Sequence, residues 1–165
     1  MKGKLRSILI YMRIRLSKPD DAAALARLHR GTIRSINAQH YTQAQIAVWS
    51  GRTNARRFRD SHTVAVRYVA VEADKIIGFV DFKKEDSETF WGLYVHKDFL
   101  GRGVGSALMR KAQQVAIAMG ARKFKLEATI TAKAFYERMG FTVLKKAKHR
   151  IEDQDLPVYV MQKLF

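Results

Sequence analysis

Cysteine is absent from the 165 residues of this chain. Structural disulfides, thiolate metal sites and a cysteine acyl-enzyme are therefore excluded, and any acyl transfer must go directly to the acceptor or through another nucleophile. No apolar run approaches the roughly 18–20 residues of a membrane-spanning helix. The apolar stretch at residues 8–12 is too short for a signal peptide, and no small-residue cleavage site follows it. We expect a cytoplasmic protein that has no membrane partner and no metal site.

Acidic residues are also scarce, because 15 Asp and Glu stand against 31 Lys and Arg and give a net charge of +16. The segment 99–126 contains no acidic residue but six basic ones: Arg102, Arg110, Lys111, Arg122, Lys123 and Lys125. Two further basic clusters lie at residues 52–59 and 145–150. The first cluster suits a polyanionic cofactor, whereas the other two suit an acidic substrate, RNA or simple solvation.

The length and an apolar fraction of 47% predict one compact domain with a substantial core. We assign residues 1–11 to an N-terminal extension and residues 12–165 to a single domain. Apolar periodicity predicts the order β-α-α-β-β-β-α-β-α-β-β, in which the last two strands form an antiparallel pair. Such an order fits an α/β protein with a mixed sheet and helices on both faces. The predicted strands cover residues 12–16, 64–71, 76–82, 89–96, 123–128, 141–148 and 156–162, and the predicted helices cover 22–37, 42–49, 104–119 and 131–139.

Two local signals refine the first two helices. Asp20 or Asp21 is the expected cap of the first helix. Thr42 and Gln45 resemble a capping box at the start of the second. Residues 52–60, which follow the second helix, are predicted to form a polar, basic connection that can include a helical turn.

A glycine-rich loop is the most informative feature of the chain. Residues 100–106 read Leu-Gly-Arg-Gly-Val-Gly-Ser and join an extended apolar run to an amphipathic helical run. Such a junction presents free backbone N–H groups at the positive end of a helix dipole, which favours an anion and most often a phosphate. The loop lacks the Gly-Lys-Ser/Thr of a Walker loop. Its glycine spacing also differs from a dinucleotide fingerprint, and no acidic residue follows at the required distance.

Two motifs resemble the GCN5-related N-acetyltransferase (GNAT) superfamily. That family's acyl-CoA loop reads Arg/Gln-x-x-Gly-x-Gly/Ala, and this chain has Leu100-x-x-Gly103-x-Gly105 after a strand at 93–95. About 30 residues later, residues 132–141 read Ala-Lys-Ala-Phe-Tyr-Glu-Arg-Met-Gly-Phe, which is similar to the family's second motif, Ala-x-x-φ-Tyr-x-x-x-Gly-Phe. The resemblance covers roughly residues 13–165 and implies the acyl-CoA N-acyltransferase fold.

The resemblance implies acetyl-CoA as co-substrate and assigns residues to it. The backbone of the loop would hold the pyrophosphate, with added charge from the Arg102 side chain. The strand before the loop would pair with the pantetheine arm, and the Leu93 amide would polarise the acetyl carbonyl. Leu100 departs from the family's Arg or Gln, and Thr129 stands where the family often has Asn. The implied cofactor-binding residues are Leu93, Tyr94, Val95, Leu100, Gly101, Arg102, Gly103, Val104, Gly105, Ser106, Thr129, Lys133 and Tyr136.

The resemblance also implies catalytic roles. Tyr136 would protonate the departing thiolate as a general acid. The alternative is a Tyr that packs on the sheet and never donates a proton. An amine acceptor must also lose a proton, and Glu127 is our preferred general base. The predicted catalytic residues are therefore Tyr136, Glu127 and Leu93. Other candidates for this step are Glu88, His96, Glu72, Asp81 and a water relay.

The acceptor would enter near the two N-terminal helices, where Tyr41 and Trp49 are the candidate contacts. For Trp49, anchoring of its helix to the core is the alternative. The basic residues around this side favour an acidic acceptor. We therefore predict an acetyl-CoA-dependent N-acetyltransferase acting on an unidentified amine. The alternatives are a nucleic-acid- or ribosome-associated binding protein on this fold, which is not favoured, and a non-catalytic acyl-CoA sensor. The resemblance is also compatible with a homodimer.

Overall fold

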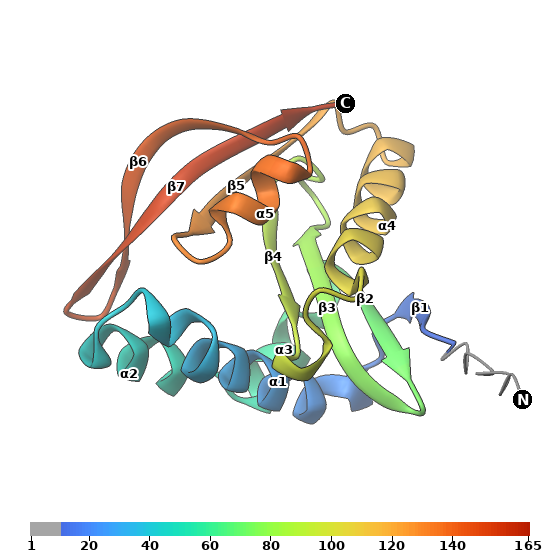
Figure 1. Cartoon of the computed structure of the whole chain (residues 1–165). Coiled ribbons are helices and arrows are strands. Elements are labelled where there is room, and N and C mark those ends of the chain that lie inside the picture. Colours follow the sequence, from blue (N-terminus) through green and yellow to red (C-terminus); the bar gives the residue numbers. More distant parts are fainter. Residues whose placement is uncertain (1–10) are drawn as a thin grey trace, which may run out of the picture.

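The computed structural model describes residues 11–165 (Figure 1). The predicted extension at residues 1–11 lies outside the described residues, apart from Tyr11. Within the described residues the strands form two antiparallel sheets, and helices cover both faces of the larger sheet (Figure 1). No helix in this part of the chain combines the length and the apolar character needed to cross a membrane.

The larger sheet has the order β1-β2-β3-β4, and all its neighbouring strands are antiparallel. Its strands are β1 (Arg13–Leu16), β2 (Ala65–Glu72), β3 (Lys75–Lys83) and β4 (Phe90–Val95). The four predicted strands are confirmed, with each end within one residue of the prediction. β2 and β3 form a hairpin because Ala73 and Asp74 adopt φ values of 46° and 61°, the conformation of a tight two-residue turn.

The smaller sheet has the order β5-β7-β6, with β5 (Lys123–Thr129), β6 (Thr142–Ile151) and β7 (Gln154–Leu164). The predicted antiparallel pair of C-terminal strands is confirmed, and both strands run longer than expected. The expected mixed sheet consists of two antiparallel sheets that meet at one parallel bridge, between Thr89 and Lys125. At that point the Lys125 amide donates to the Glu88 carbonyl at 2.9 Å, and beyond it β4 and β5 do not pair.

The four predicted helices are confirmed, with each end within two residues of the prediction. The capping box is confirmed, because the Gln45 amide donates to Thr42 Oγ1 at 3.2 Å and the Thr42 amide donates to Gln45 Oε1 at 2.9 Å. The segment expected as a basic connection that can include a helical turn contains a short helix, whose first turn is capped by Asn54. The helices are α1 (Ala22–Ser35), α2 (Gln43–Gly51), α3 (Ala55–Asp60), α4 (Val104–Ala118) and α5 (Lys133–Arg138).

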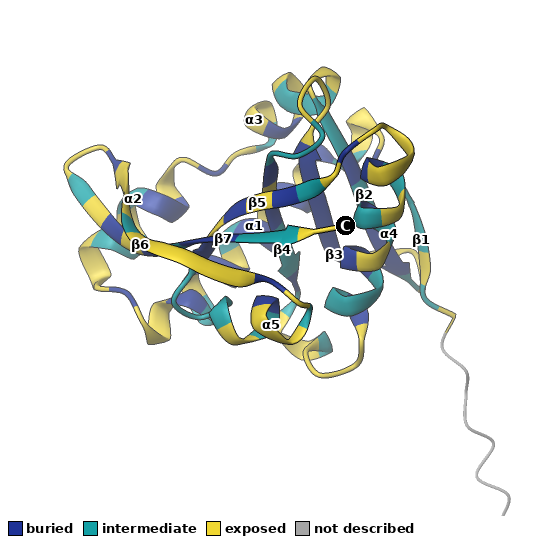
Figure 2. Cartoon of the chain, turned by 90° about the horizontal axis from the view of Figure 1, so that it is seen from above, coloured by how far each residue is buried: buried dark blue, intermediate teal, exposed yellow. Residues whose placement is uncertain are grey.

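The core fills both faces of the larger sheet because side chains alternate along each strand. On β3, Phe79 packs with residues of α1 and α3, whereas Val80 and Phe82 pack with residues of α4. Figure 2 shows β2 and β3 as largely buried, in contrast to the mostly exposed β6. The two faces therefore bury separate clusters, and α1 and α4 lie on opposite sides of β3 (Figure 1).

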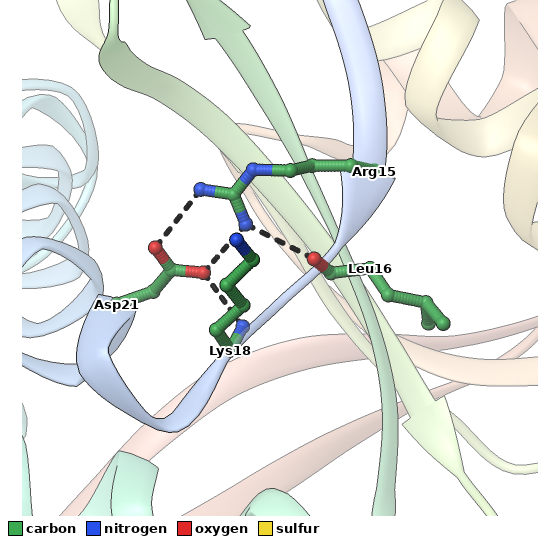
Figure 3. A network of polar contacts seen from close by, with 4 residues as sticks. All are labelled: Arg15, Leu16, Lys18 and Asp21. Atoms are coloured by element: carbon green, nitrogen blue, oxygen red, sulfur yellow. Dashed lines mark hydrogen bonds and ion pairs between the residues drawn. The ribbon is translucent and has the colours of Figure 1, made fainter.

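A polar network fixes the connection between β1 and α1 (Figure 3). The Arg15 guanidinium donates to both carboxylate oxygens of Asp21, at 2.8 and 3.0 Å, and also to the Leu16 carbonyl at 3.0 Å. The Lys18 amide donates to Asp21 Oδ2 at 2.7 Å. Asp21 therefore closes the turn before α1. The prediction that Asp20 or Asp21 caps α1 is wrong for the side chain, because Asp21 is the N-cap residue but its side chain makes no capping hydrogen bond to that helix. The hydrogen bonds from Arg15 lower the pKa of the Asp21 carboxyl.

We expect Asp21→Ala to lower the free energy of unfolding near neutral pH by about 1–2 kcal/mol, because hydrogen bonds to a charged group are lost. The pKa of Asp21 is lower in the folded than in the unfolded chain. Its contribution is therefore complete above the ordinary pKa of 3.8 and is lost as the pH falls below that value. Urea unfolding of both proteins at neutral and strongly acidic pH measures this difference.

The matched control is Asp74→Ala, which removes a pair with Arg13 in which the Asp74 side chain is 96% exposed. This variant should unfold as the wild type does, because exposed pairs contribute little. A loss for Asp21→Ala that is the same at both pH values would contradict the predicted linkage.

Candidate functional site

The loop before α4 leaves the first turn of that helix open. Gly101 and Gly103 adopt φ values of 71° and 80°, a left-handed conformation that favours glycine, and Gly103 is the N-cap residue. Within residues 11–165 no side chain caps α4, whereas Thr42 and Asn54 cap α2 and α3. Because the first amides of a helix lack intrahelical partners, those that follow Gly103 point outward at the positive end of the dipole. This end of α4 is suited to an anion.

A cavity of about 520 Å³, which we call the loop cavity, extends from this helix end along β4 to α5. Its lining comes from α1, β4, the loop, the start of α4, the end of β5 and α5. The predicted cofactor residues that line it are Leu93, Tyr94, Val95, Leu100, Gly101, Gly103, Val104, Gly105, Ser106, Thr129 and Tyr136. The fold therefore gathers most of the predicted cofactor set in one place.

The backbone of β4 has unused hydrogen-bonding groups along this cavity. The His96 amide donates to the Ile77 carbonyl of the neighbouring chain at 2.8 Å, and successive amides of a strand point to opposite sides. The Tyr94 amide therefore points toward β3, and the amides of Leu93 and Val95 point away from it. On that side β4 has parted from β5. Leu93 and Val95 thus present free amides to the space between the strands.

Tyr136 lies on α5 and is 5% exposed. Its ring contacts the rings of Phe90, Phe135 and Phe141, with centroids 5.4–6.1 Å apart. Among residues 11–165 its hydroxyl has no hydrogen-bond partner, and Gln113 Nε2 is the one fully buried side-chain atom in that state. The Tyr136 hydroxyl therefore retains access to the loop cavity. Burial raises the pKa of Tyr136, so the phenol keeps its proton at neutral pH.

A second cavity of about 750 Å³, which we call the charged cavity, lies between α1, α2, α3 and the smaller sheet. Trp91, Tyr94, Glu127 and Thr129 line both cavities. The two spaces therefore meet at the gap between β4 and β5. A group held in the loop cavity and a group held in the charged cavity can approach each other there.

Glu127 stands at this junction, and its Oε2 lies 2.8 Å from His149 Nδ1. Of the other candidate bases, Asp81 lines the charged cavity but is buried in an ion pair with Arg67 at 2.7 Å. His96 is outside both linings. Two more candidates are paired elsewhere: Glu88 accepts from the Arg122 amide at 3.0 Å, and Glu72 lies 3.3 Å from Arg102.

Two predicted cofactor residues lie outside both cavity linings. Arg102 is held by Glu72 and packs over the Phe99 ring at 4.9 Å. Lys133 lies 2.9 Å from Glu137, whose hydrogen bond raises the pKa of Lys133. None of the six basic residues at 102–125 lines the loop cavity within residues 11–165.

Thr129 lines both cavities, but its Oγ1 also makes two contacts within the protein. It accepts from the Ala132 amide at 3.1 Å and lies 3.4 Å from Asn37 Nδ2. The side chain therefore helps to position the turn between β5 and α5.

Of the two residues predicted to contact the acceptor, only Trp49 lines a cavity. Trp49 is 9% exposed and lines the charged cavity. Tyr41 is outside both linings, since its hydroxyl donates to the Pro157 carbonyl at 2.7 Å and accepts from the Ile130 amide at 3.0 Å. Its ring lies against that of Trp49 at 5.7 Å. Tyr41 therefore ties the segment before α2 to β7 and to the turn that follows β5.

Sequence reasoning left out several cavity residues, among them His29, Arg67 and Phe135. His29 is buried, its Nδ1 lies 2.8 Å from Thr53 Oγ1, and burial lowers its pKa to about 3, so the ring is neutral. A signal existed for Arg67, because opposite charges interrupt the two apolar strands of the hairpin. A turn at residues 73–74 brings Arg67 directly opposite Asp81.

The site and the fold can be compared with known proteins. A family model described as "Acetyltransferase (GNAT) domain" matches residues 63–143. The uncharacterized N-acetyltransferase YafP of Escherichia coli K12 is 26% identical over 137 residues, which span 83% of this chain and 85% of that protein.

Solved structures share the fold over nearly the whole chain. A GCN5-related N-acetyltransferase from Rhodopseudomonas palustris matches with a TM-score of 0.87 and 24% identity, covering 93% of this chain and 96% of that one. The PaiA N-acetyltransferase of Thermoplasma acidophilum, solved in complex with coenzyme A, matches with a TM-score of 0.79 and 19% identity, covering 94% and 99%. The family model, the curated relatives and the structural neighbours together indicate a member of the GNAT superfamily and an acyltransferase.

We expect Tyr41→Phe to lower the free energy of unfolding by about 1–3 kcal/mol, because it leaves the Pro157 carbonyl and the Ile130 amide without their shared partner. Thermal and urea unfolding measure the loss. Tyr159→Phe is the control, since Tyr159 is only partly buried and has no such pair of hydrogen bonds within the described residues. Equal stability of the Tyr41→Phe variant and the wild type would contradict a tying role for Tyr41.

Proposed function

We propose that this protein transfers an acetyl group from acetyl-CoA directly to an amine. The observation that carries this proposal is the meeting of two cavities at the gap between β4 and β5. One cavity has free backbone amides along its length, and the other has a carboxylate where the two join. This arrangement suits a long anionic donor on one side and a protonated acceptor on the other.

The loop cavity fits an acyl-CoA by the chemistry of its lining. The uncapped start of α4 offers amides to a pyrophosphate, and its first turn contains no acidic side chain. A Cβ added at Gly105 would lie 3.2 Å from the Phe135 ring, so glycine lets the helix start pack closely against α5. The free amides of Leu93 and Val95 suit the amide groups of a pantetheine arm. Coenzyme A in the related Thermoplasma structure supports the same assignment.

Acetyl-CoA supplies an activated acetyl thioester, and the residues of this chain handle the charges. Glu127 accepts a proton from the ammonium form of the acceptor, and the free amine then attacks the carbonyl carbon. The Leu93 amide donates a hydrogen bond to the carbonyl oxygen as negative charge develops there. Tyr136 donates its phenolic proton to the departing thiolate. The acceptor nitrogen loses its second proton to the Tyr136 phenolate, and Glu127 releases the first proton to solvent. A neutral amide and a protonated thiol then leave the site, with one proton released per turnover.

Calorimetric titration with acetyl-CoA at two salt concentrations tests the proposal, beside free CoA and a bulk RNA. We expect micromolar binding of acetyl-CoA and only weak RNA binding that disappears with added salt. Tight, salt-sensitive RNA binding without acetyl-CoA binding would instead establish a nucleic-acid-binding protein. Acetyl-CoA binding without turnover of any amine would establish a sensor.

We expect Tyr136→Phe to lower kcat by on the order of 10²-fold while the dissociation constant of acetyl-CoA stays the same, since general acid catalysis contributes about that much. Steady-state kinetics with a thiol-release readout measures kcat, and calorimetry measures binding. Tyr159→Phe serves as the control with unchanged kcat. A Tyr136→Phe variant with full kcat would assign the ring to packing alone.

A further inference from the structure

One face of the smaller sheet lines the charged cavity. Only some of the basic residues of this sheet lie on that face. Lys125, Glu127 and Thr129 alternate along β5 and line the cavity, as do Lys145 and His149 on β6. Lys145 and Glu127 both pair with Val160 of β7, which places them in one row across the sheet. The intervening Lys146, Lys148 and Arg150 are absent from the lining. The basic cluster at residues 145–150 is therefore divided between two faces.

The buried ion pair of this cavity adds no net charge. Arg67 and Asp81 are 4% and 6% exposed, and Arg67 Nε donates to Asp81 Oδ2 at 2.8 Å. Arg67 Nη2 also donates to Ser61 Oγ at 3.1 Å. His29, at the same wall, is neutral. The donors of Arg67 are therefore largely occupied by the protein, and an incoming anion has to be held by other residues.

The remaining charges of the lining are unequal. Arg57, Lys125 and Lys145 are exposed at the cavity, and none of them forms an ion pair with another residue in 11–165. Glu127 is the one remaining carboxylate among the lining residues, and it already contacts His149. Apart from the Arg67–Asp81 pair, the described lining of the charged cavity thus has three unpaired cations and one carboxylate, which lies at the junction with the loop cavity.

The rest of the wall is apolar and aromatic. It includes Trp49, Phe58, Trp91 and the valines of β7. A volume of about 750 Å³ has the size of a small-molecule site. Free cations beside an apolar wall bind an anion more strongly than they would in open water, because the local dielectric constant is lower. The cavity is therefore built for a small ligand that has a negative end.

We propose that the acceptor is a small amine that also carries a carboxylate or phosphate group, and that Arg57, Lys125 and Lys145 select it. This inference rests on the proposed function. The amine lies at the junction beside Glu127, and the anion lies in the charged cavity beside the three cations. The cations contact the part of the acceptor that does not react, so they determine specificity and take no part in proton transfer.

Matched amines test the proposal: phosphoethanolamine against ethanolamine, and phenylalanine against phenethylamine. Each is titrated calorimetrically into the protein saturated with CoA and is then assayed with acetyl-CoA. We expect the anionic member of at least one pair to bind at least about 10-fold more tightly and to show the higher kcat/KM, as charge-assisted hydrogen bonds allow. The pair that responds distinguishes phosphate from carboxylate. Added salt should reduce the difference.

Lys145→Gln and Arg57→Gln should raise the KM and the dissociation constant of the anionic amine on the order of 10-fold while leaving its kcat within about 2-fold. The neutral partner amine should show little change in either variant. Lys146→Gln is the matched control, because it removes the same charge from the other face of the same strand. Calorimetry with acetyl-CoA should give the wild-type value for all three variants.

Equal binding of anionic and neutral amines would overturn the proposal, and so would the same response from Lys145→Gln and Lys146→Gln. Acetylation of acidic peptides without binding of any small anionic amine would also overturn it, in favour of a protein acceptor. Anionic amines that bind but are never acetylated would count against the proposed function and leave the binding assignment intact. If the wild-type protein does not bind acetyl-CoA, the proposed function is refuted, whereas the binding of anionic amines in the charged cavity is judged by their own titrations.

Discussion

The parting of β4 from β5 is the constraint on which the rest of the structure depends. The two strands share a single parallel bridge at Thr89 and Lys125 and then separate. A buried strand normally satisfies its amides by pairing with both neighbours. Among the strands that the structure describes, none pairs with the amides of Leu93 and Val95 on the side away from β3, and both cavities open onto that gap. A β4 paired along its full length with β5 would close the passage between them.

Helices pack on both faces of the larger sheet beside the gap. α4 packs on one face of the larger sheet through Leu108 and Met109, whereas α1 packs on the other face through Leu25 and Leu28. The end of α4 that faces the gap is uncapped, and the α5 tyrosine beside it has no hydrogen-bond partner within the described residues. These unsatisfied groups would be costly in a closed core. Their concentration at one place is the reason to propose the ligand site here.

The two cavities differ in the source of their electrostatic field. The loop cavity relies on backbone dipoles, since none of the basic residues between 102 and 125 lines it within the described part of the chain. The charged cavity relies on side chains, of which one buried pair is neutralised internally. A net charge of +16 therefore says little about either cavity. Only the few cations whose side chains face the charged cavity without a partner bear on what it binds.

The sequence by itself determined the elements and the loop cavity, because these depend on local patterns. Each of these patterns acts within a few residues: strand alternation, the Thr42 capping box and the glycines of residues 101–105. The structure has the strands, the capped start of α2 and the loop before α4 where these patterns predict them. The hydrogen-bonding role of Tyr41 and the existence of the charged cavity came only from tertiary structure. Lys145 and Lys146 are neighbours with the same charge, yet the pleat of β6 directs one to the cavity and the other away. Which face of β6 meets α1 and α2 is set by packing between segments about 100 residues apart, and no local pattern contains that information.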